Sequence, residues 1–340
     1  MEQGIWNLET LWFVLIAVLW IGFFFLEGFD FGVGILLPFI GKDDTDRRVM
    51  INTIGPTWDA NEVWLLTAGG ATFAAFPEWY ATMFSGFYLP LFLILFALIF
   101  RGVAFEYRSK DKLPQWRTTW DWLIFVGSLL PALLFGVAFG NLVRGLEIDA
   151  AGEYVGGFWA LLNPFSLAMG VASVVLFTLH GAIFLALKAS GDVRDRAAAL
   201  SKPLAIAATA VMAISMIWTY LTSDSGFVPG MLPILAIGLL GVVIWLTREG
   251  MFGWAFACTG LTIVAVVAGI FVGMYPNVMT STINPDYSLT VFNASSTTMT
   301  LQIMTVVALI FVPIVLVYQS WSYWVFRERV GREDVTASTT

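Results

Sequence analysis

The sequence predicts an all-α protein, a polytopic bundle of about nine transmembrane helices, and three observations support this fold class. Hydrophobic residues make up 59% of the 340 residues and charged residues only 12%, whereas a soluble domain carries roughly 25% charged residues. Apolar stretches long enough to cross the roughly 30 Å hydrocarbon core recur along the chain. Lysine and arginine cluster in alternate connections between these stretches, as in loops on one side of a membrane.

Nine stretches approach the length of about 20 apolar residues that a membrane-spanning helix needs. They cover roughly residues 11–38, 53–75, 80–101, 122–143, 160–187, 204–221, 231–246, 252–275 and 300–326. The second stretch contains several polar residues and the seventh is short, so these two depart most from an ideal span. No linker or soluble domain interrupts them, and residues 1–340 are therefore expected to form a single integral membrane domain.

The basic residues predict the orientation of the chain. Of the 17 lysines and arginines, all but Arg144 fall in the tail or in the loops after the first, third, fifth and seventh stretches, counting loop edges. The longest loop on the other side, 276–299, has no basic residue. Because positively charged loops stay on the cytoplasmic side, the amino terminus is expected outside and the carboxyl terminus in the cytoplasm.

Composition also limits the possible ligands and cofactors. The net charge of −7 includes no basic stripe, so nucleic acid is excluded as a partner. A single cysteine, Cys258, excludes an intrachain disulfide framework and a cysteine-rich metal or iron–sulfur site. The one histidine, His180, would ligate at most one haem, and a structural role is the more common one for such a residue. Redox cofactors are therefore expected on a partner.

Four acidic residues lie inside the first two apolar stretches. Glu27 and Asp30 come late in the first stretch, and Asp59 and Glu62 come early in the second. Each pair is spaced i, i+3, so its carboxyl groups share a helix face. Both pairs are expected in the cytoplasmic half of the membrane, facing each other across one hairpin. Asp59 is expected about seven residues into its span, on the order of 10 Å deep.

Acids at this depth have two interpretations. A charged side chain at mid-membrane costs roughly 2.5–3.5 kcal/mol on insertion scales, and proton relays are a recurring reason to keep one. The four acids are therefore candidate proton carriers, with Asn61 and Trp58 beside Asp59 shaping a polar pocket. The alternative is a structural role, in which the acids pair with Arg101 at the inner end of the third stretch and Trp58 is a packed aromatic residue.

Seven short segments together resemble one known family, in the expected order along the chain. They are 28–34 (GFDFGVG), 52–65 (NTIGPTWDANEVWL), 67–70 (TAGG), 84–88 (FSGFY), 101–110 (RGVAFEYRSK), 136–141 (GVAFGN) and 180–182 (HGA). This combination resembles subunit II of the cytochrome bd quinol oxidases. The match is poor over 222–300, and Glu27 stands where the family often has an aspartate.

The resemblance implies a haem-free subunit in a heterodimer with subunit I, in the cytoplasmic membrane of a prokaryote. Subunit I of this family binds two b-type haems and haem d, and quinol and O2 react there. The family reduces O2 to water with cytoplasmic protons and builds a proton gradient without pumping. Subunit II supports assembly and proton supply, and the aspartate matching Asp59 lies on a hydrophilic channel towards the haem subunit. The resemblance leaves open small single-span accessory subunits and a structural quinone in this subunit.

Two other functions remain open on the sequence alone. A proton-coupled transporter would also combine many spans with intramembrane acids, although the paired repeats and broken helices common in transporters are not evident. A purely structural scaffold would stabilise its partner without carrying protons.

Overall fold

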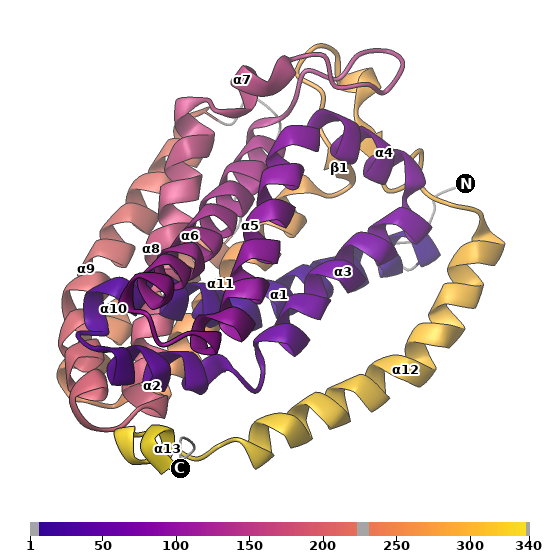
Figure 1. Ribbon diagram of the computed structural model, residues 1–340. Coiled ribbons are helices and arrows are strands. Elements are labelled where there is room, and N and C mark those ends of the chain that lie inside the picture. The colour runs from indigo at the N-terminus through magenta and orange to yellow at the C-terminus, as the bar shows by residue number, and fades with distance from the viewer. Residues whose placement is uncertain (1–6, 223–230, 338–340) are drawn as a thin grey trace.

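The computed structural model describes residues 7–222 and 231–337, and these residues form an almost entirely helical bundle (Figure 1). The all-α fold class is confirmed. The α-helices are α1 Leu8–Ile40, α2 Asp44–Ile54, α3 Trp58–Ala75, α4 Pro77–Gly86, α5 Tyr88–Tyr107, α6 Pro114–Arg144, α7 Gly157–Leu161, α8 Pro164–Lys188, α9 Gly191–Thr222, α10 Leu232–Arg248, α11 Phe252–Met274, α12 Thr298–Val325 and α13 Arg332–Ala337. Short 3-10 helices, η1 Arg108–Lys110 and η2 Pro285–Tyr287, and the strands β1 Asn277–Met279 and β2 Leu289–Thr290 complete the described elements.

Seven of the described helices are long and apolar enough to cross a membrane, namely α1, α5 continued by η1, α6, α8, α9, α11 and α12. The short seventh stretch corresponds to α10, which has 17 residues. The polar second stretch corresponds to α3, which has 18 residues. Each predicted stretch thus contains a helix, while the count of nine spans and the direction of the two termini stay predictions.

The second predicted stretch, 53–75, begins too early. α2 ends at Ile54, and α3 starts only at Trp58. The Gly55-Pro56 step separates the two helices. Gly55 still has helical dihedrals, but Pro56 has no backbone N–H and therefore cannot continue the hydrogen bonds of α2. The third stretch, 80–101, likewise begins inside α4, and α5 starts at Tyr88.

α1 lies at the centre of the bundle and packs against α3, α6, α8 and α11. Near its middle, Phe24 contacts Phe135 and Phe139 of α6, with ring centroids 5.7 and 5.2 Å apart. In its carboxyl-terminal half, Gly32 meets Gly181 of α8 so closely that a Cβ at either glycine would lie within 3 Å of the other helix's backbone. Gly28 and Gly32 are four residues apart, and such a small-residue pattern is typical of helices that approach closely in a membrane.

α12 stands at the edge of the molecule, apart from the main bundle (Figure 1). Leu301 is its one buried residue among those the structure describes. At the amino-terminal end of α12, the indole of Trp12 donates hydrogen bonds to the Leu301 carbonyl and the Thr305 hydroxyl, both at 3.1 Å. Met304 and Ala308 pack against the core, while most of the other apolar side chains of this helix are exposed.

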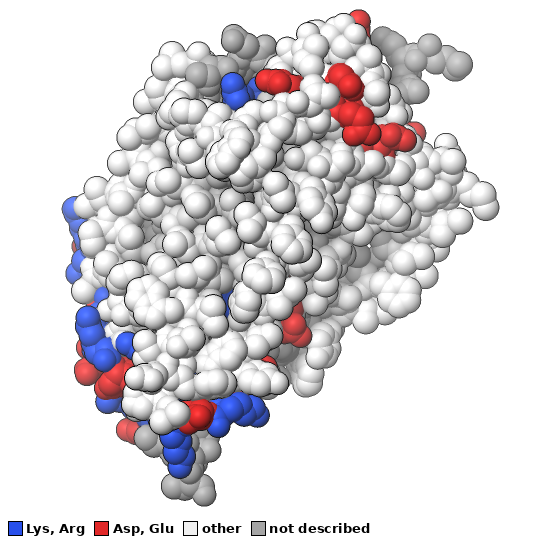
Figure 2. Space-filling model, turned by 45° about the horizontal axis from the view of Figure 1, so that its top comes forward, with Lys and Arg blue, Asp and Glu red and all other residues white. Residues whose placement is uncertain are grey.

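Charge is distributed unevenly over the described surface. Figure 2 shows lysine and arginine gathered at the end that carries α2 and α13, while mainly acidic side chains occupy the opposite end. The opposite end is capped by α7 and by the antiparallel strand pair β1–β2, which pairs Asn277 with Thr290. This asymmetry agrees with the one that predicts a cytoplasmic carboxyl terminus.

Candidate functional site

Three helices bring acidic residues of the first two stretches together around one arginine. Glu27 and Asp30 of α1 and Arg101 of α5 are all 0% exposed. The Arg101 Nη2 group forms ion pairs with Glu27 Oε1 and, at 3.3 Å, with Glu62 Oε2 of α3. We call Glu27, Asp30, Asn61, Glu62 and Arg101 the acid cluster.

Aromatic rings hold the Arg101 guanidinium in place. Its Cζ atom lies 4.7 Å from the centroid of the Phe31 ring and 5.7 Å from that of Phe105. A cation over an aromatic face in a desolvated site gains about 2 kcal/mol. The pairing of Arg101 with the acids, expected under the structural interpretation, is therefore present, and Arg101 is the positive centre of the site.

Asn61 connects to the second acid of α1. Its Nδ2 group donates to Asp30 Oδ2 at 2.7 Å, and Asn61 is 0% exposed. Within the part of the chain that the structure describes, the other carboxyl oxygens, Glu27 Oε2 and Asp30 Oδ1, are buried without a hydrogen-bond partner. Buried polar atoms in native proteins nearly always bond to a protein group or to water, so these oxygens are positions where a proton or a water molecule can be accepted.

The structure does not bring Asp59 into the acid cluster. Asp59 is the second residue of α3 and has an exposed side chain, so the expected position seven residues into a span is wrong. It lies one helical turn before Glu62, whose side chain is 22% exposed. Trp58 packs on Phe105 with ring centroids 5.0 Å apart, as expected for a packed aromatic residue.

Two residues of α12 join the site, and the sequence analysis did not single them out. Tyr323 donates to Asn61 Oδ1 at 2.7 Å, and Gln319 Nε2 donates to the same oxygen at 3.3 Å. The spacing i, i+4 places both on one face of the helix. Polar side chains on one face of an otherwise apolar stretch were the available signal, but their partner lies some 260 residues away in the sequence.

The imidazole of His180 has polar contacts at both ring nitrogens and packs against an aromatic ring. Its Nδ1 lies 2.7 Å from the Thr259 hydroxyl and its Nε2 lies 3.3 Å from the carbonyl of Phe25. The ring stacks on Phe256 with centroids 4.5 Å apart. Because both ring nitrogens have polar partners, the residue does not fit an axial haem ligand, which needs one nitrogen free for the iron.

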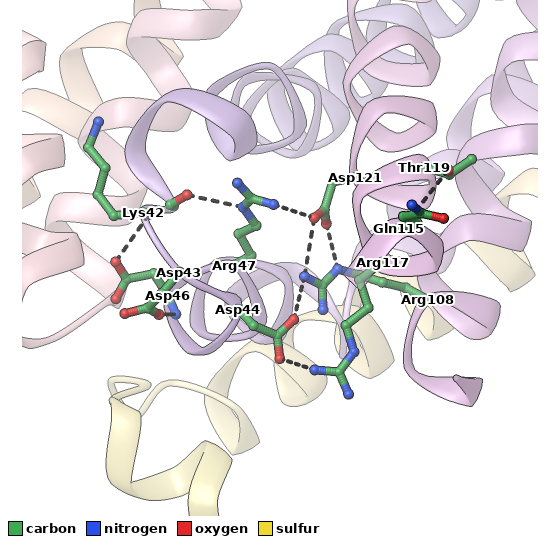
Figure 3. Close-up of polar contacts among 11 residues, drawn as sticks. Lys42, Asp43, Asp44, Asp46, Arg47, Arg108, Gln115, Arg117, Thr119 and Asp121 are labelled. Atoms are coloured by element: carbon green, nitrogen blue, oxygen red, sulfur yellow. Dashed lines mark hydrogen bonds and ion pairs between the residues drawn. The ribbon is translucent and has the colours of Figure 1, made fainter. Parts of the chain in front are cut away.

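A second charged cluster lies at the basic end of the molecule, between α2, η1 and α6 (Figure 3). Asp121 accepts from Arg47 at 2.8 Å and from Arg108 at 2.5 Å. Asp44 accepts from Arg108 at 2.9 Å and from Arg117 at 2.5 Å. From the sequence these basic residues are expected only as loop charges, but Arg108 and its partner Asp121 are nearly fully buried.

The same cluster continues to the carboxyl-terminal helix α13. Asp46 pairs with Arg196 and with Arg332, and Arg332 also pairs with Asp43. Asp43 is the N-cap of α2 and accepts from the Asp46 amide at 2.9 Å. This backbone hydrogen bond, together with Arg332, lowers the pKa of the Asp43 carboxyl below its usual value.

Acid is therefore expected to loosen the contact between α2 and α13. A carboxyl whose folded-state pKa is depressed stabilises the fold above its unfolded-state pKa, about 3.9, and this contribution is lost as the pH falls through the lower folded-state value. We expect hydrogen exchange in α2 and α13, corrected for its intrinsic pH dependence, to rise below about pH 4. The Asp43→Asn variant should show a smaller rise, and an equal rise in both proteins would contradict this assignment.

Comparison with known proteins shows the family to which the chain belongs. The family model described as cytochrome bd terminal oxidase subunit II matches residues 8–326. The chain belongs to this family. Subunit 2 of the cytochrome bd ubiquinol oxidase of Bacillus subtilis is 44% identical over 332 residues, covering 96% of this chain and 98% of the relative.

A second relative supports the family, and a solved structure supports the fold. Subunit 2 of the cytochrome bd-I ubiquinol oxidase of Escherichia coli K12 is 40% identical over 369 residues, covering 98% of this chain and 97% of the relative. A chain of the solved bd oxidase from Geobacillus thermodenitrificans has the same fold, with a TM-score of 0.73 and 18% identity over 94% of this chain and 97% of that one. The resemblance seen in the sequence motifs is thus confirmed, and the chain is an integral membrane subunit of an oxidoreductase complex, which implies a subunit I partner.

Proposed function

We propose that this chain is the haem-free subunit II of a bd-type quinol oxidase in the cytoplasmic membrane of a prokaryote. The complex oxidises quinol and reduces O2 to water, and it takes the protons for water from the cytoplasm without pumping others. In this proposal subunit II supports the assembly of subunit I and conducts protons through its intramembrane acids. The names of its relatives, which are subunits of ubiquinol oxidases, support this assignment.

The acid cluster is the observation that carries the proton-supply proposal. It holds carboxyl groups at 0% exposure within the membrane-spanning helix α1, where acids are costly and are commonly retained for function. The proposed route begins at Asp59 on the surface of α3, continues through Glu62 one turn further, and reaches Glu27 and Asp30 beside Arg101. Asn61 belongs to the route through its hydrogen bond to Asp30.

The haems belong to the partner in this proposal. His180 does not fit a haem iron, for the reason given above, so the two b-type haems and haem d are assigned to subunit I. The residues of this chain then transfer protons, and electrons pass only through the haems of subunit I. Quinol and O2 react at subunit I, and this chain delivers protons towards it.

Neutralising Asp59 is expected to lower O2 consumption per haem about a hundredfold, the scale on which a positioned acid–base group acts. The variants Asp59→Asn and Asp59→Ala should still purify with the haem subunit and show the haem b and haem d bands in a reduced-minus-oxidised spectrum. Glu78→Gln is the matched control, because Glu78 is an exposed acid in the first turn of α4. Full quinol oxidase activity in both Asp59 variants would remove this residue from the mechanism.

A structural scaffold is the second candidate function, and the ion pairs of Arg101 favour it. It differs from proton supply in a measurable way. If single replacements of Glu27, Asp30, Asp59 and Glu62 leave turnover per haem normal while lowering the yield of the complex, the acids serve assembly alone.

A further inference from the structure

Near its carboxyl-terminal end, α12 contacts the acid cluster through two polar side chains, Gln319 and Tyr323. Gln319 and Tyr323 are partly buried, whereas Tyr318 and Trp321 beside them are 63% and 57% exposed. The phenol of Tyr323 and the amide of Gln319 converge on one atom, Asn61 Oδ1. An otherwise exposed helix therefore makes a specific polar contact with a fully buried amide.

The hydrogen bonds at this contact have a direction that chemistry determines. An indole N–H only donates, and Trp64 Nε1 lies 2.9 Å from Gln319 Oε1. Gln319 must therefore present its oxygen to Trp64 and its NH2 group to Asn61. Asn61 Oδ1 accepts from Gln319, at 3.3 Å, and from Tyr323, at 2.7 Å.

The orientation of the Asn61 carboxamide follows in the same way. With its oxygen turned towards α12, Asn61 has its NH2 group on the opposite side, where Nδ2 donates to Asp30 Oδ2 at 2.7 Å. The series Trp64, Gln319, Asn61, Asp30 thus runs from a group that only donates to a carboxyl that accepts. A flipped Asn61 amide would place two oxygens, Oδ1 and a carboxyl oxygen of Asp30, against each other, which is unfavourable unless Asp30 carries a proton.

We propose that Tyr323 and Gln319 of α12 are positioning residues, which hold the Asn61 carboxamide in the orientation that donates to the Asp30 carboxyl group. Neither residue touches a substrate in this inference, and both act through Asn61. The effect that this positioning has on turnover rests on the proposed proton-supply function. The orientation itself does not depend on that function.

The orientation of Asn61 acts on Asp30 within a set of charged and titratable groups from several helices. Glu27 lies on the same helix, Arg101 comes from α5, Glu62 from α3 and Tyr323 from α12. Arg101 pairs with Glu27 and Glu62, so the hydrogen bond from Asn61 is the direct polar contact to Asp30 that links it to α12. Releasing Asn61 therefore changes the surroundings of one carboxyl group while the ion pairs of the acid cluster stay intact.

Removing the Tyr323 hydroxyl tests the inference in the assembled oxidase. In Tyr323→Phe the infrared band of the Asp30 carboxyl, identified by its loss in Asp30→Asn, is expected to shift relative to the unmodified protein. Turnover per haem d should fall about fivefold, the effect of one net hydrogen bond, and the ratio of rates in H2O and D2O should rise. Gln319→Leu should act in the same direction. Tyr318→Phe, which removes an exposed hydroxyl from the same helix, should leave the band, the turnover and the isotope ratio unchanged.

The outcomes separate this inference from the proposed function. An unshifted Asp30 band in both Tyr323→Phe and Gln319→Leu would overturn the positioning role, whatever the turnover. Wild-type turnover in Asp30→Asn would instead reject Asp30 as a proton carrier, and a shifted band in Tyr323→Phe would then still establish the positioning role. Because turnover is normalised to haem d, a simple loss of assembled protein does not imitate either result.

Discussion

Replacing Arg101 with methionine is expected to destabilise the assembled protein by about 3–5 kcal/mol, the usual cost of removing one partner from a buried ion pair. The side chain is 0% exposed and is the positive centre between Glu27 and Glu62. Methionine fills a similar volume between Phe31 and Phe105 but leaves the carboxyl groups without a counterion. The measurement is the fraction of complex that survives heating in detergent, followed by size-exclusion chromatography.

Two companion variants identify the cause of this loss. Arg144→Met removes an exposed arginine at the other end of the bundle and should leave the thermal stability unchanged. The double variant Glu27→Leu with Arg101→Met removes a charge of each sign, and we expect it to recover part of the stability, because apolar replacements of a buried pair are often tolerated. If Arg101→Met alone has unaltered stability, the ion pairs are not what holds α1, α3 and α5 together.

The second large effect is expected from Gly32→Ala, where α1 crosses α8. An added Cβ would collide with the Phe177 carbonyl oxygen and lie 2.8 Å from the Gly181 Cα atom. Both are backbone atoms in the middle of a helix, so no side chain can rotate away and the helices must separate. Overpacking of this kind costs about 1–3 kcal/mol, and the shift also moves Glu27 and Asp30, which lie on the same helix. We expect a lower yield of complex, a lower midpoint of thermal unfolding, and reduced turnover in the protein that remains.

A glycine with open space around it provides the control for this substitution. Gly241 lies within α10, and a Cβ there would meet no atom within 4 Å. Since alanine is favoured over glycine in a helix interior by roughly 1 kcal/mol, Gly241→Ala should be neutral or slightly stabilising. Equal stability of the Gly32→Ala protein and the unmodified protein would show that the two helices do not meet as closely as described.

The sequence was sufficient to predict the fold class and the acids, because both depend on local composition. A long apolar run must form a helix in a membrane, since the lipid offers no partner to free backbone groups, and an acid inside such a run is conspicuous. The spacing of Glu27 and Asp30 and the position of Arg101 at the end of its stretch were enough to expect a cluster. The assembled site contains all three.

The parts that sequence reasoning missed depend on chain breaks and on distant contacts. The start of α3 was placed too early because the polar stretch 53–75 was counted as one helix, although Gly55-Pro56 marks a break. That error displaced Asp59 into the membrane interior. Tyr323 was missed because its partner, Asn61, is far away in the sequence. The ion pairs of Asp46 were missed because the basic residues of a loop are ordinarily solvated. The local sequence does not show which acid each of them will pair with.

The late position of α12 in the chain determines when the acid cluster can be completed during synthesis. Every other candidate spanning helix among the described residues precedes α12 in the chain, so the ribosome releases α12 after them. Until α12 arrives, the Asn61 oxygen lacks the two donors from Gln319 and Tyr323, and the carboxamide is oriented only by its bond to Asp30. Maturation of the site is therefore delayed until α12 has been synthesised, and a nascent chain truncated before Gln319 would insert the helices that precede α12 while lacking a correctly oriented Asn61.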